Sequence, residues 1–534
     1  MSNRRRWAVT IGVMTGMFIA ALEATVVGTA MPTVIATLGG ISHYSWVFSA
    51  YLVTSTVTVP VWGKLSDLYG RRLLYQMGIG VFLLGTLLSG LSNSMTELII
   101  FRAIQGLGAG ALVPLGMTII GDIFTLHERA KMQAYFSGVW GLSSVVGPVV
   151  GGFITDQISW RWVFFVNLPI GIIAALIIGL SLKEPKGRPN PSIDYGGAVS
   201  LMLAISLLML AMVEGGSSIA TLFSIENVAI FAAGFALLGI FIWVELRTKD
   251  PIIPFRLFRN RTIAVAVSAG FLAGIAMFGA ISFIPLFAQG ALGMSATEAG
   301  SLLTPLMLSW VTMSVIGGRL LLHVGFRGVA ITGFAVLTLG FVLLGTFQIE
   351  TPRYRLYLDL VLVGAGLGLT MLTLLIAVQQ AVERTQLGVA TSLNQFSRAI
   401  GGAFGVAIMG AVFTAGLSSH IRAAAAFPDS GITTEQAVEF ASNPNALIEP
   451  SARAHLPAET LDLLQEAMAG AMHPVFWVGA GVCVLALLVT FLMPKRREGT
   501  DLHRSDSNVG ETMIMAEQTT INARNQPAAD SEAY

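Results

Sequence analysis

Charge is scarce in this chain. Only 11% of its 534 residues are Asp, Glu, Lys or Arg, whereas 54% are hydrophobic, and the formal net charge is +1. A typical soluble domain carries about 25% charged residues. The composition therefore excludes an ordinary soluble protein and indicates a polytopic membrane protein, and the lack of a basic surplus gives no support for nucleic-acid binding.

Cysteine and histidine are also sparse. Cys483 is the single cysteine, so the chain cannot form an internal disulfide. The seven histidines are scattered without the spacing of metal ligands. No nucleophile elbow, paired catalytic acids or selectivity-filter sequence is present. These absences argue against a membrane-embedded enzyme, against a channel and against a metal or other cofactor.

Long apolar runs, by contrast, fill the chain. A cytoplasmic N-terminus places 22 of the 31 Lys and Arg residues at cytoplasmic ends and loops and five outside, as the positive-inside rule requires. We therefore expect a protein of the cell (inner) membrane with fourteen spans and both termini cytoplasmic. The runs long enough to cross a bilayer are residues 7–31, 46–63, 72–91, 97–120, 134–155, 162–182, 195–213, 226–246, 262–287, 297–318, 328–348, 355–378, 393–417 and 472–493.

Three regions are expected outside the bundle. Residues 183–194 form a polar, proline-rich cytoplasmic connection. The longest outer loop, residues 418–471, contains AETLDLLQEAMAG, whose spacing fits a short amphipathic helix at the membrane surface or over the bundle, or a plain solvated helix. Residues 499–534 are polar and lack a core-forming pattern, which predicts a disordered cytoplasmic tail.

An internal repeat divides the chain. The segment GKLSDLYGRR, residues 63–72, has a decayed copy 255 residues later, and glycines of the fourth and fifth helices recur 258 residues later. Such a repeat predicts two related six-helix halves with a substrate site between them near the midplane of the membrane. We expect an N-terminal half at 1–190, two inserted helices at 191–261 and a C-terminal half at 262–498.

Four motifs carry a resemblance to a known family. GKLSDLYGRR resembles the signature loop of the major facilitator superfamily, and RAIQGLGAG, from Arg102, is similar to its fourth-helix motif. GPVVGG, from Gly147, looks like the fifth-helix motif of antiporters. LEATVVGTAMP, from Leu22, is similar to the first-helix motif of the fourteen-helix drug:proton antiporter branch. The resemblance covers about residues 7–493 and implies an all-α major facilitator fold, two six-helix halves plus two inserted central helices.

The resemblance also implies roles for residues on the cytoplasmic side. Asp67 would hold the two halves together against the start of the thirteenth helix near Leu393, and Arg71 would pair with Asp122. These contacts would favour the outward-open state and break during the transport cycle. The second copy has Leu322 where Asp67 sits, so no matching latch is implied there. The other residues assigned to the latch are Gly63, Gly70 and Arg72.

Glycines are expected to set helix packing. By resemblance, Gly147 and Pro148 would bend the fifth helix and bring it against the other half, with Val406 replacing the proline in the second copy. Gly151 and Gly152 complete this motif. Four pairs of glycines spaced four apart on apolar helices predict close helix contacts; they are Gly106/Gly110, Gly147/Gly151, Gly364/Gly368 and Gly401/Gly405.

Glu23 is the one charge in the first apolar run. An ionisable residue in hydrocarbon costs a few kcal/mol and usually serves ion or substrate movement. The best candidate partner is Arg102, because both residues would lie in the outer half of the membrane. Two further interpretations stay open: a protonated Glu23 that only packs against a neighbouring helix, and an Arg102 that only ties two helices together. Members of the branch often carry aspartate where this chain has Glu23.

These features favour secondary active export by alternating access, with protons entering as hydrophobic or cationic, drug-like compounds leave. The alternative is a lipid or glycolipid exporter of the same fold. We expect a small-molecule substrate, protons and membrane lipids as partners, no nucleic acid, and a monomer. Arg398, with Asn394 and Gln395, either lines the cavity or extends to the inner interface, and the second interpretation is favoured here.

Overall fold

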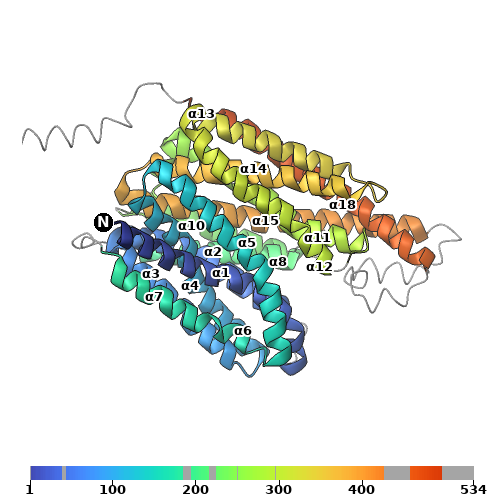
Figure 1. Ribbon diagram of the computed structural model, residues 1–534, viewed down its shortest axis with the longest axis horizontal. Helices are drawn as coiled ribbons and strands as arrows, with labels where there is room; N and C mark the ends of the chain where they lie inside the picture. Colours follow the sequence, from blue (N-terminus) through green and yellow to red (C-terminus); the bar gives the residue numbers. More distant parts are fainter. Residues whose placement is uncertain are drawn as a thin grey trace, which may run out of the picture. The chain divides into compact units, whose positions relative to one another are not determined.

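The computed structural model describes residues 2–38, 44–183, 194–215, 224–248, 250–294, 296–425 and 458–495. Within these ranges the chain is helical between short connections and contains no strand. Each of the fourteen predicted runs is mainly helical, although residues 162–182 and 297–318 are each divided between two helices (Figure 1). Eleven of these helices meet criteria of length and apolarity for crossing a membrane, and the fold is that of a multi-pass membrane protein.

The helices fall into three groups along the chain. The first group, called the N-terminal bundle, comprises α1 (Asn3–Leu38), α2 (Tyr44–Tyr69), α3 (Arg71–Leu91), α4 (Met95–Ile123), α5 (Leu126–Gln157), α6 (Trp162–Phe165) and α7 (Asn167–Ser181). The second comprises α8 (Tyr195–Gly215), α10 (Ile225–Glu245) and the short 3-10 helix η2 (Phe255–Arg259). The third, called the C-terminal bundle, comprises α11 (Arg261–Gly290), α12 (Ala296–Ser301), α13 (Leu303–Gly345), α14 (Arg353–Gln380), η3 (Arg384–Gln386), α15 (Leu387–Ala425) and α18 (Ala458–Phe491).

The buried apolar side chains gather mainly within the two bundles. One cluster holds residues of α1, α3, α4, α5 and α7 together with Leu375 of α14. The largest cluster holds the C-terminal bundle and α8, together with Val57 and Val59 of α2. Each bundle therefore has its own core, and only a few side chains are shared. The boundaries expected for the halves stay a prediction.

The two copies of the loop motif share an unusual backbone conformation. Gly70 separates α2 from α3 with φ 102°, and Gly325, at the equivalent position of the second copy, has φ 76°. Side chains with a Cβ atom rarely adopt such angles. Gly325 lies inside α13 and divides it into the two predicted spans, so one continuous helix label covers both. The end of the bundle at which α2 meets α3 is called the Gly70 end below.

Helix contacts follow the same repeat. A Cβ atom on Gly106 or Gly110 of α4 would collide with the backbone of α2. A Cβ atom on Gly364 or Gly368 of α14 would collide with the backbone of the first part of α13. Glycine thus lets equivalent helix pairs approach closely in both bundles.

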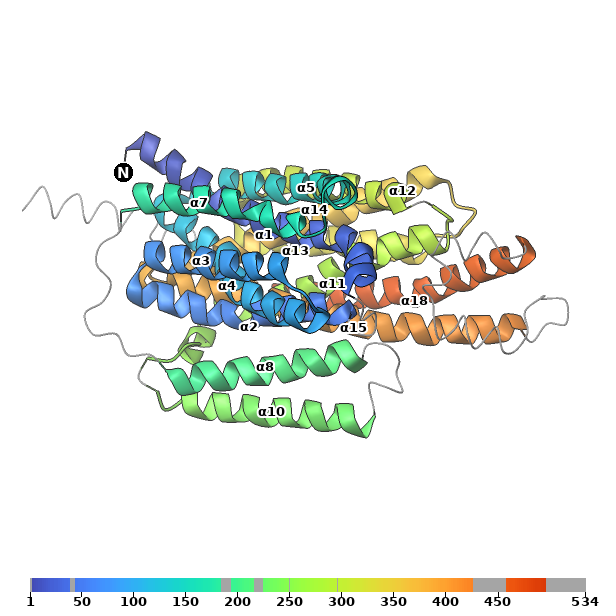
Figure 2. The same cartoon turned by 90° about the horizontal axis from the view of Figure 1, so that it is seen from below.

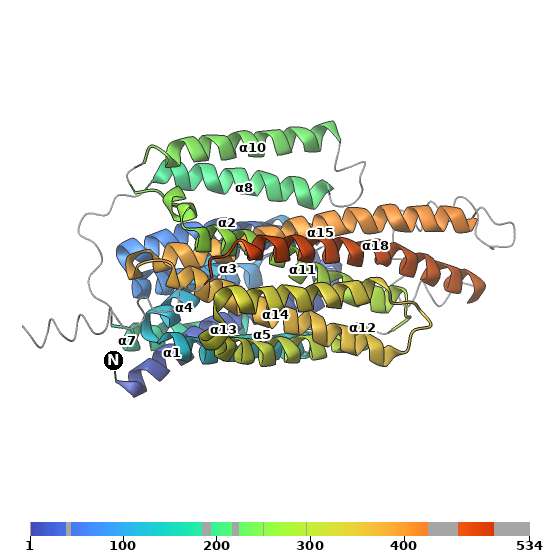
Figure 3. The same cartoon turned by 90° about the horizontal axis from the view of Figure 1, so that it is seen from above.

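Helices α8 and α10 lie side by side along one side of the two bundles (Figures 2 and 3). Only α8 makes extensive contact with them, against α2 and α15. Large apolar side chains of α10 are exposed, including Phe235 and Trp243, each with 56% of its surface accessible. This exposure fits a helix that faces lipid.

Two predicted boundaries are wrong. The segment 418–471 is not one loop, because α15 continues to Ala425 and α18 begins at Ala458. AETLDLLQEAMAG is the first part of α18 and runs into the last span without a break. Its buried Leu464 and Met468 pack in the core of the C-terminal bundle, so the amphipathic pattern faces protein. Residues 426–457, the connection 184–193 and the expected tail at 499–534 lie outside the described residues.

Candidate functional site

Glu23 lies at the centre of a buried polar network. Its side chain on α1 has no exposed surface. Oε1 accepts a hydrogen bond of 2.5 Å from Nη1 of Arg102 on α4, and Oε2 accepts one of 2.6 Å from Nδ2 of Asn167 on α7. The structure therefore brings the two predicted residues together and adds a third that the sequence had not singled out. Charge-assisted hydrogen bonds of this kind are among the stronger ones in proteins.

Arg102 extends the network to further helices. Its Nε donates to the carbonyl oxygen of Val47 on α2, its Nη1 donates to Oε1 of Gln105, and its Cζ lies 4.3 Å from the ring centre of Tyr51. Gln105 donates in turn to Oγ1 of Thr86 on α3. All these partners belong to the N-terminal bundle.

The network leaves little access to water in this conformation. Arg102 is 2% exposed, and Gln105, Thr86 and Asn167 are fully buried. Removing one member of a buried ion pair leaves the other charge uncompensated, which typically costs about 3–5 kcal/mol. Exchange of a proton with Glu23 therefore requires a rearrangement of α1, α4 or α7.

A second cluster joins the two bundles at the Gly70 end. Asp67 of α2 accepts hydrogen bonds from the backbone N–H groups of Gly388, at 3.0 Å, and Val389, at 2.8 Å. Both groups lie in the first turn of α15, where helical N–H groups have no partner within the helix and the helix dipole favours an anion. The contact was expected near Leu393. The helix starts earlier because buried polar residues such as Thr391 and Ser392, which interrupt the apolar run, are still helical.

Arg71 lies between two carboxylates at this end. Its Nη2 is 2.6 Å from Oδ1 of Asp67, and its Nε is 3.1 Å from Oδ2 of Asp122. It also donates to the carbonyl oxygen of Arg384, in the segment before α15. The neighbouring Arg72 is exposed. Asp67, Arg71 and Asp122 thus form one charged cluster that touches both bundles.

Two glycines permit this close crossing of α2 and α15. A Cβ atom on Gly63 would lie 2.9 Å from the carbonyl oxygen of Gly388 and would collide with the side chain of Ser392. A Cβ atom on Gly388 would lie 2.7 Å from Oδ1 of Asp67. Backbone contact between the bundles therefore depends on the absence of side chains at these positions.

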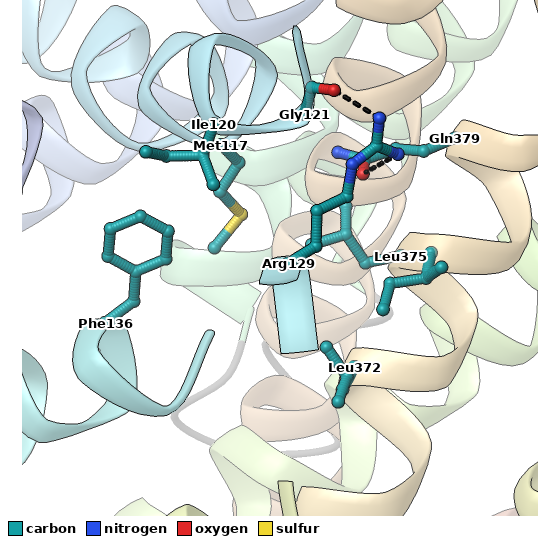
Figure 4. Close-up of a pocket in the computed structure, with 9 residues that line it drawn as sticks. Met117, Ile120, Gly121, Arg129, Phe136, Leu372, Leu375 and Gln379 are labelled. Atoms are coloured by element: carbon teal, nitrogen blue, oxygen red, sulfur yellow. Dashed lines mark hydrogen bonds between the residues drawn. The ribbon is translucent and has the colours of Figure 1, made fainter. Parts of the chain in front are cut away.

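A further contact between the two bundles involves Arg129 (Figure 4). Arg129 of α5 donates to the carbonyl oxygens of Gly121 and Phe124 and to Oε1 of Gln379 on α14. The void there, lined also by Met117, Phe136, Leu372 and Leu375, measures only about 10 Å³. That is room for about one water molecule. The seam between the bundles is closed at this position.

The fifth-helix motif lies on α5. Helix α5 packs against α1 and against α13. Gly147 and Gly151 are buried, whereas a Cβ atom on Gly152 would meet no other atom within 4 Å. The side chain of Pro148 is outside what the structure describes. The bend expected at these residues stays a prediction.

Arg398 lies eleven residues into α15, about 16 Å along the helix from its first residue. This position argues for a cavity-lining side chain over the favoured extension to the inner interface, which stays a prediction. Nη1 of Arg398 lies 3.7 Å from Sδ of Met371 on α14. Asn394 and Gln395, on the same part of α15, are buried, whereas Arg398 is partly exposed.

The C-terminal bundle contains a buried carboxylate that was not predicted from the sequence. Asp359 of α14 is 2% exposed, and its Oδ2 is 4.0 Å from Nε of Arg355. Its signal was an acid within a long apolar run, the same signal that identified Glu23. Asn167 and Gln105 are neutral amides and gave a weaker signal.

Comparison with known proteins places the chain among transporters. The family model described as Major Facilitator Superfamily matches residues 13–406. The multidrug transporter protein MdtP of Bacillus subtilis is 40% identical, over 92% of this chain and 93% of that protein. Multidrug resistance protein 3 of the same organism is 36% identical, over 92% of this chain and 96% of that protein.

Solved structures show the same fold. The human organic anion transporter MFSD10 aligns with a TM-score of 0.60 over 92% of this chain and 100% of that chain, at 17% identity. The proton:xylose symporter XylE aligns with a TM-score of 0.55 over 93% of this chain and 97% of that chain, at 14% identity. At such identities the likeness concerns the fold alone.

Proposed function

The chain belongs to the major facilitator superfamily, in the branch that contains multidrug efflux transporters, and we propose that it exports hydrophobic, drug-like organic compounds, cationic ones included, in exchange for protons. The observation that carries this proposal is the carboxylate of Glu23, held inside the first helix by Arg102 and Asn167. The names of the two bacterial relatives support the class of substrate. The protein works as a monomer in the cell membrane, among lipids, with both termini in the cytoplasm.

The conformation described here is the state closed to the cytoplasm. With that orientation the Gly70 end faces the cytoplasm, and the contacts of Asp67 with α15 and of Arg129 with Gln379 close the path between the bundles. Breaking these contacts opens the path to the inside as the bundles rock against each other. Arg71, which contacts Asp67 and Asp122, also donates to the carbonyl oxygen of Arg384, and this contact with the other bundle is lost when the path opens.

In this proposal, protonation of Glu23 changes the positions of the helices that surround it. Protonation of Glu23 removes its charge, so the attraction to Arg102 weakens and the network can rearrange. Helix α1 packs against α5, and α5 packs against α13 of the other bundle. A shift of α1 is thereby transmitted to the seam between the bundles. Binding of substrate to the conformation open to the cytoplasm would favour release of the proton from Glu23.

The test is transport by purified protein in proteoliposomes with an imposed pH gradient. The wild-type protein should drive uptake of lipophilic cations against their gradient, and collapse of the pH gradient should abolish that uptake. Glu23→Gln should still exchange substrate across the membrane without a gradient but lose the response to pH, whereas Glu23→Asp should keep part of it. Wild-type coupling in Glu23→Gln would reject the proposed role of this residue.

A further inference from the structure

A polar face on α15 points into the middle of the molecule. Thr391, Asn394, Gln395 and Arg398 are spaced three or four apart and so lie on one face of the helix. Their contacts are with three other helices. Gln395 reaches Sδ of Met117 on α4, Arg398 reaches Sδ of Met371 on α14, and Asn394 lies against Gly270 of α11. This face therefore lies where the two bundles meet.

The hydrogen bonds of this face are incomplete. Within the described ranges Arg398 has no carboxylate at ion-pair distance, and its guanidinium donates a hydrogen bond to the thioether sulfur of Met371, which is a weak acceptor. Asn394 is 4% exposed, and its Nδ2 has no acceptor among the described residues. Gln395 is 5% exposed, and its Oε1 likewise has no donor there. Arg71 and Arg102, by contrast, each contact a carboxylate.

The buried amide of Asn394 without an acceptor is costly, since it has lost its water without gaining a partner. The partly exposed guanidinium of Arg398 has no carboxylate partner among the described residues. A ligand that brings an anionic oxygen would supply what both groups lack. The methionines at 117 and 371 add flexible, polarisable walls that adapt to apolar groups of different shape. Such a combination suits an amphiphilic compound with an acidic group and an apolar body.

We propose that Arg398 and Asn394 bind the carboxylate, or a comparable anionic group, of a transported compound, while its apolar body packs against Met117 and Met371. The inference rests on the proposed export function and adds amphiphiles with an acidic group to the substrates proposed above.

Equilibrium binding of a matched pair of fluorescent compounds tests the inference. The pair is dansyl-phenylalanine, which carries a carboxylate, and its methyl ester, which does not. The wild-type protein in detergent should bind the acid more tightly than the ester. Arg398→Gln should weaken binding of the acid by roughly ten-fold, as expected for the loss of a charge-assisted contact, and leave binding of the ester unchanged. Arg398→Lys should retain part of the preference, because it keeps the charge but not the planar fork.

Asn394→Asp is a second, independent variant. It places a carboxylate four residues before Arg398, where the two side chains pair on the helix surface. The built-in anion should compete with the acid, so the preference for the acid should disappear while binding of the ester persists. Unchanged ester binding shows in each variant that the fold is intact.

Three results would overturn the inference: an equal loss of acid and ester binding in Arg398→Gln, an unchanged preference for the acid, or no binding of either compound by the wild-type protein. Equilibrium binding needs no proton gradient. A failure of proton-coupled export in proteoliposomes would therefore be seen separately, as ester transport that does not respond to pH.

Discussion

The carboxylate of Asp67 accepts a hydrogen bond of 2.8 Å from the backbone N–H of Val389, which lies 322 residues further along the chain. The repeat places Leu322 where an equivalent contact would need an acid. The start of α5, which corresponds to the start of α15, has a local acceptor instead: the N–H and Oγ1 of Thr125, the residue before the helix, both donate to Oε2 of Glu128. Asp67 of the N-terminal bundle therefore caps α15 of the C-terminal bundle, whereas Leu322 gives α5 no such cap.

Asp67→Asn should open the Gly70 end. The substitution removes the charge that interacts with Arg71 and with the start of α15, and it leaves a single acceptor oxygen. A cysteine placed at Leu372, beside the small void, reports the opening in a Cys483→Ser background. Labelling by a membrane-impermeant maleimide in inside-out vesicles should become several-fold faster with Asp67→Asn.

Asp67→Glu is the matched control for this experiment, because it keeps the charge. The Asp67→Glu protein should be labelled at a rate between those of the wild type and Asp67→Asn. Equal labelling rates in all three backgrounds would mean that Asp67 does not hold this end closed.

Gly63→Ala should destabilise the crossing of α2 and α15. The added methyl group would meet the carbonyl oxygen of Gly388 and the side chain of Ser392, and overpacking of this kind costs about 1–3 kcal/mol. The measurement is thermal unfolding of the purified protein together with its transport rate. Gly80→Ala on α3 is the control, since a Cβ atom there would meet nothing within 4 Å. A Gly63→Ala protein that melts and transports like the wild type would contradict the close contact.

The start of α5 should respond to pH through Glu128, which lies outside the predicted span 134–155. The hydrogen bond from the backbone N–H of Thr125 is the main cause that lowers the pKa of Glu128 below its usual 4.5, and the guanidinium of Arg6 adds to it. Because the folded-state pKa is lowered, the stabilisation is present above about pH 4.5 and is lost as the pH falls through the lower folded value.

Thermal unfolding of wild type and Glu128→Gln between pH 7 and pH 3 checks this expectation. The two melting temperatures should differ slightly at pH 7, because exposed ion pairs contribute only about 0–1 kcal/mol, and should converge as the pH falls below about 4.5. A difference that stays constant over this range would exclude the carboxylate as its source.

Much of the fold was predictable because the membrane restricts the choices. Apolar runs must form helices in lipid, and all fourteen runs are mainly helical. The ends of the helices were less predictable. Polar residues such as Thr391 and Ser392 break the hydropathy signal, although they are buried at the seam between the bundles and remain helical. Hydropathy cannot distinguish a polar group in water from one buried against another bundle.

The candidate site was predictable where charge made it conspicuous. Glu23 and Arg102 stand out because each is a charged residue in an apolar run. Asn167 was not found, since a neutral amide at the start of an apolar run resembles any helix boundary, and its link to Glu23 spans 144 residues. Asp359 carried the same signal as Glu23 but lacked a recognisable motif. Which buried polar groups meet is decided by helix packing, which the local sequence does not encode.

A double-mutant cycle on Glu23 and Arg102 separates the structural role of this pair from its proposed function. Arg102→Gln leaves the carboxylate of Glu23 buried without its cation, so we expect a loss of stability of about 3–5 kcal/mol and little folded protein. The double variant Glu23→Gln/Arg102→Gln contains two neutral amides that can hydrogen-bond to each other, so its melting temperature should recover most of the way. Transport measured in the same preparations should nevertheless show no response to an imposed pH gradient. If the double variant regains both its stability and its pH-driven transport, the pair only ties α1 to α4, and the proton must bind elsewhere, with the buried Asp359 as the next residue to test.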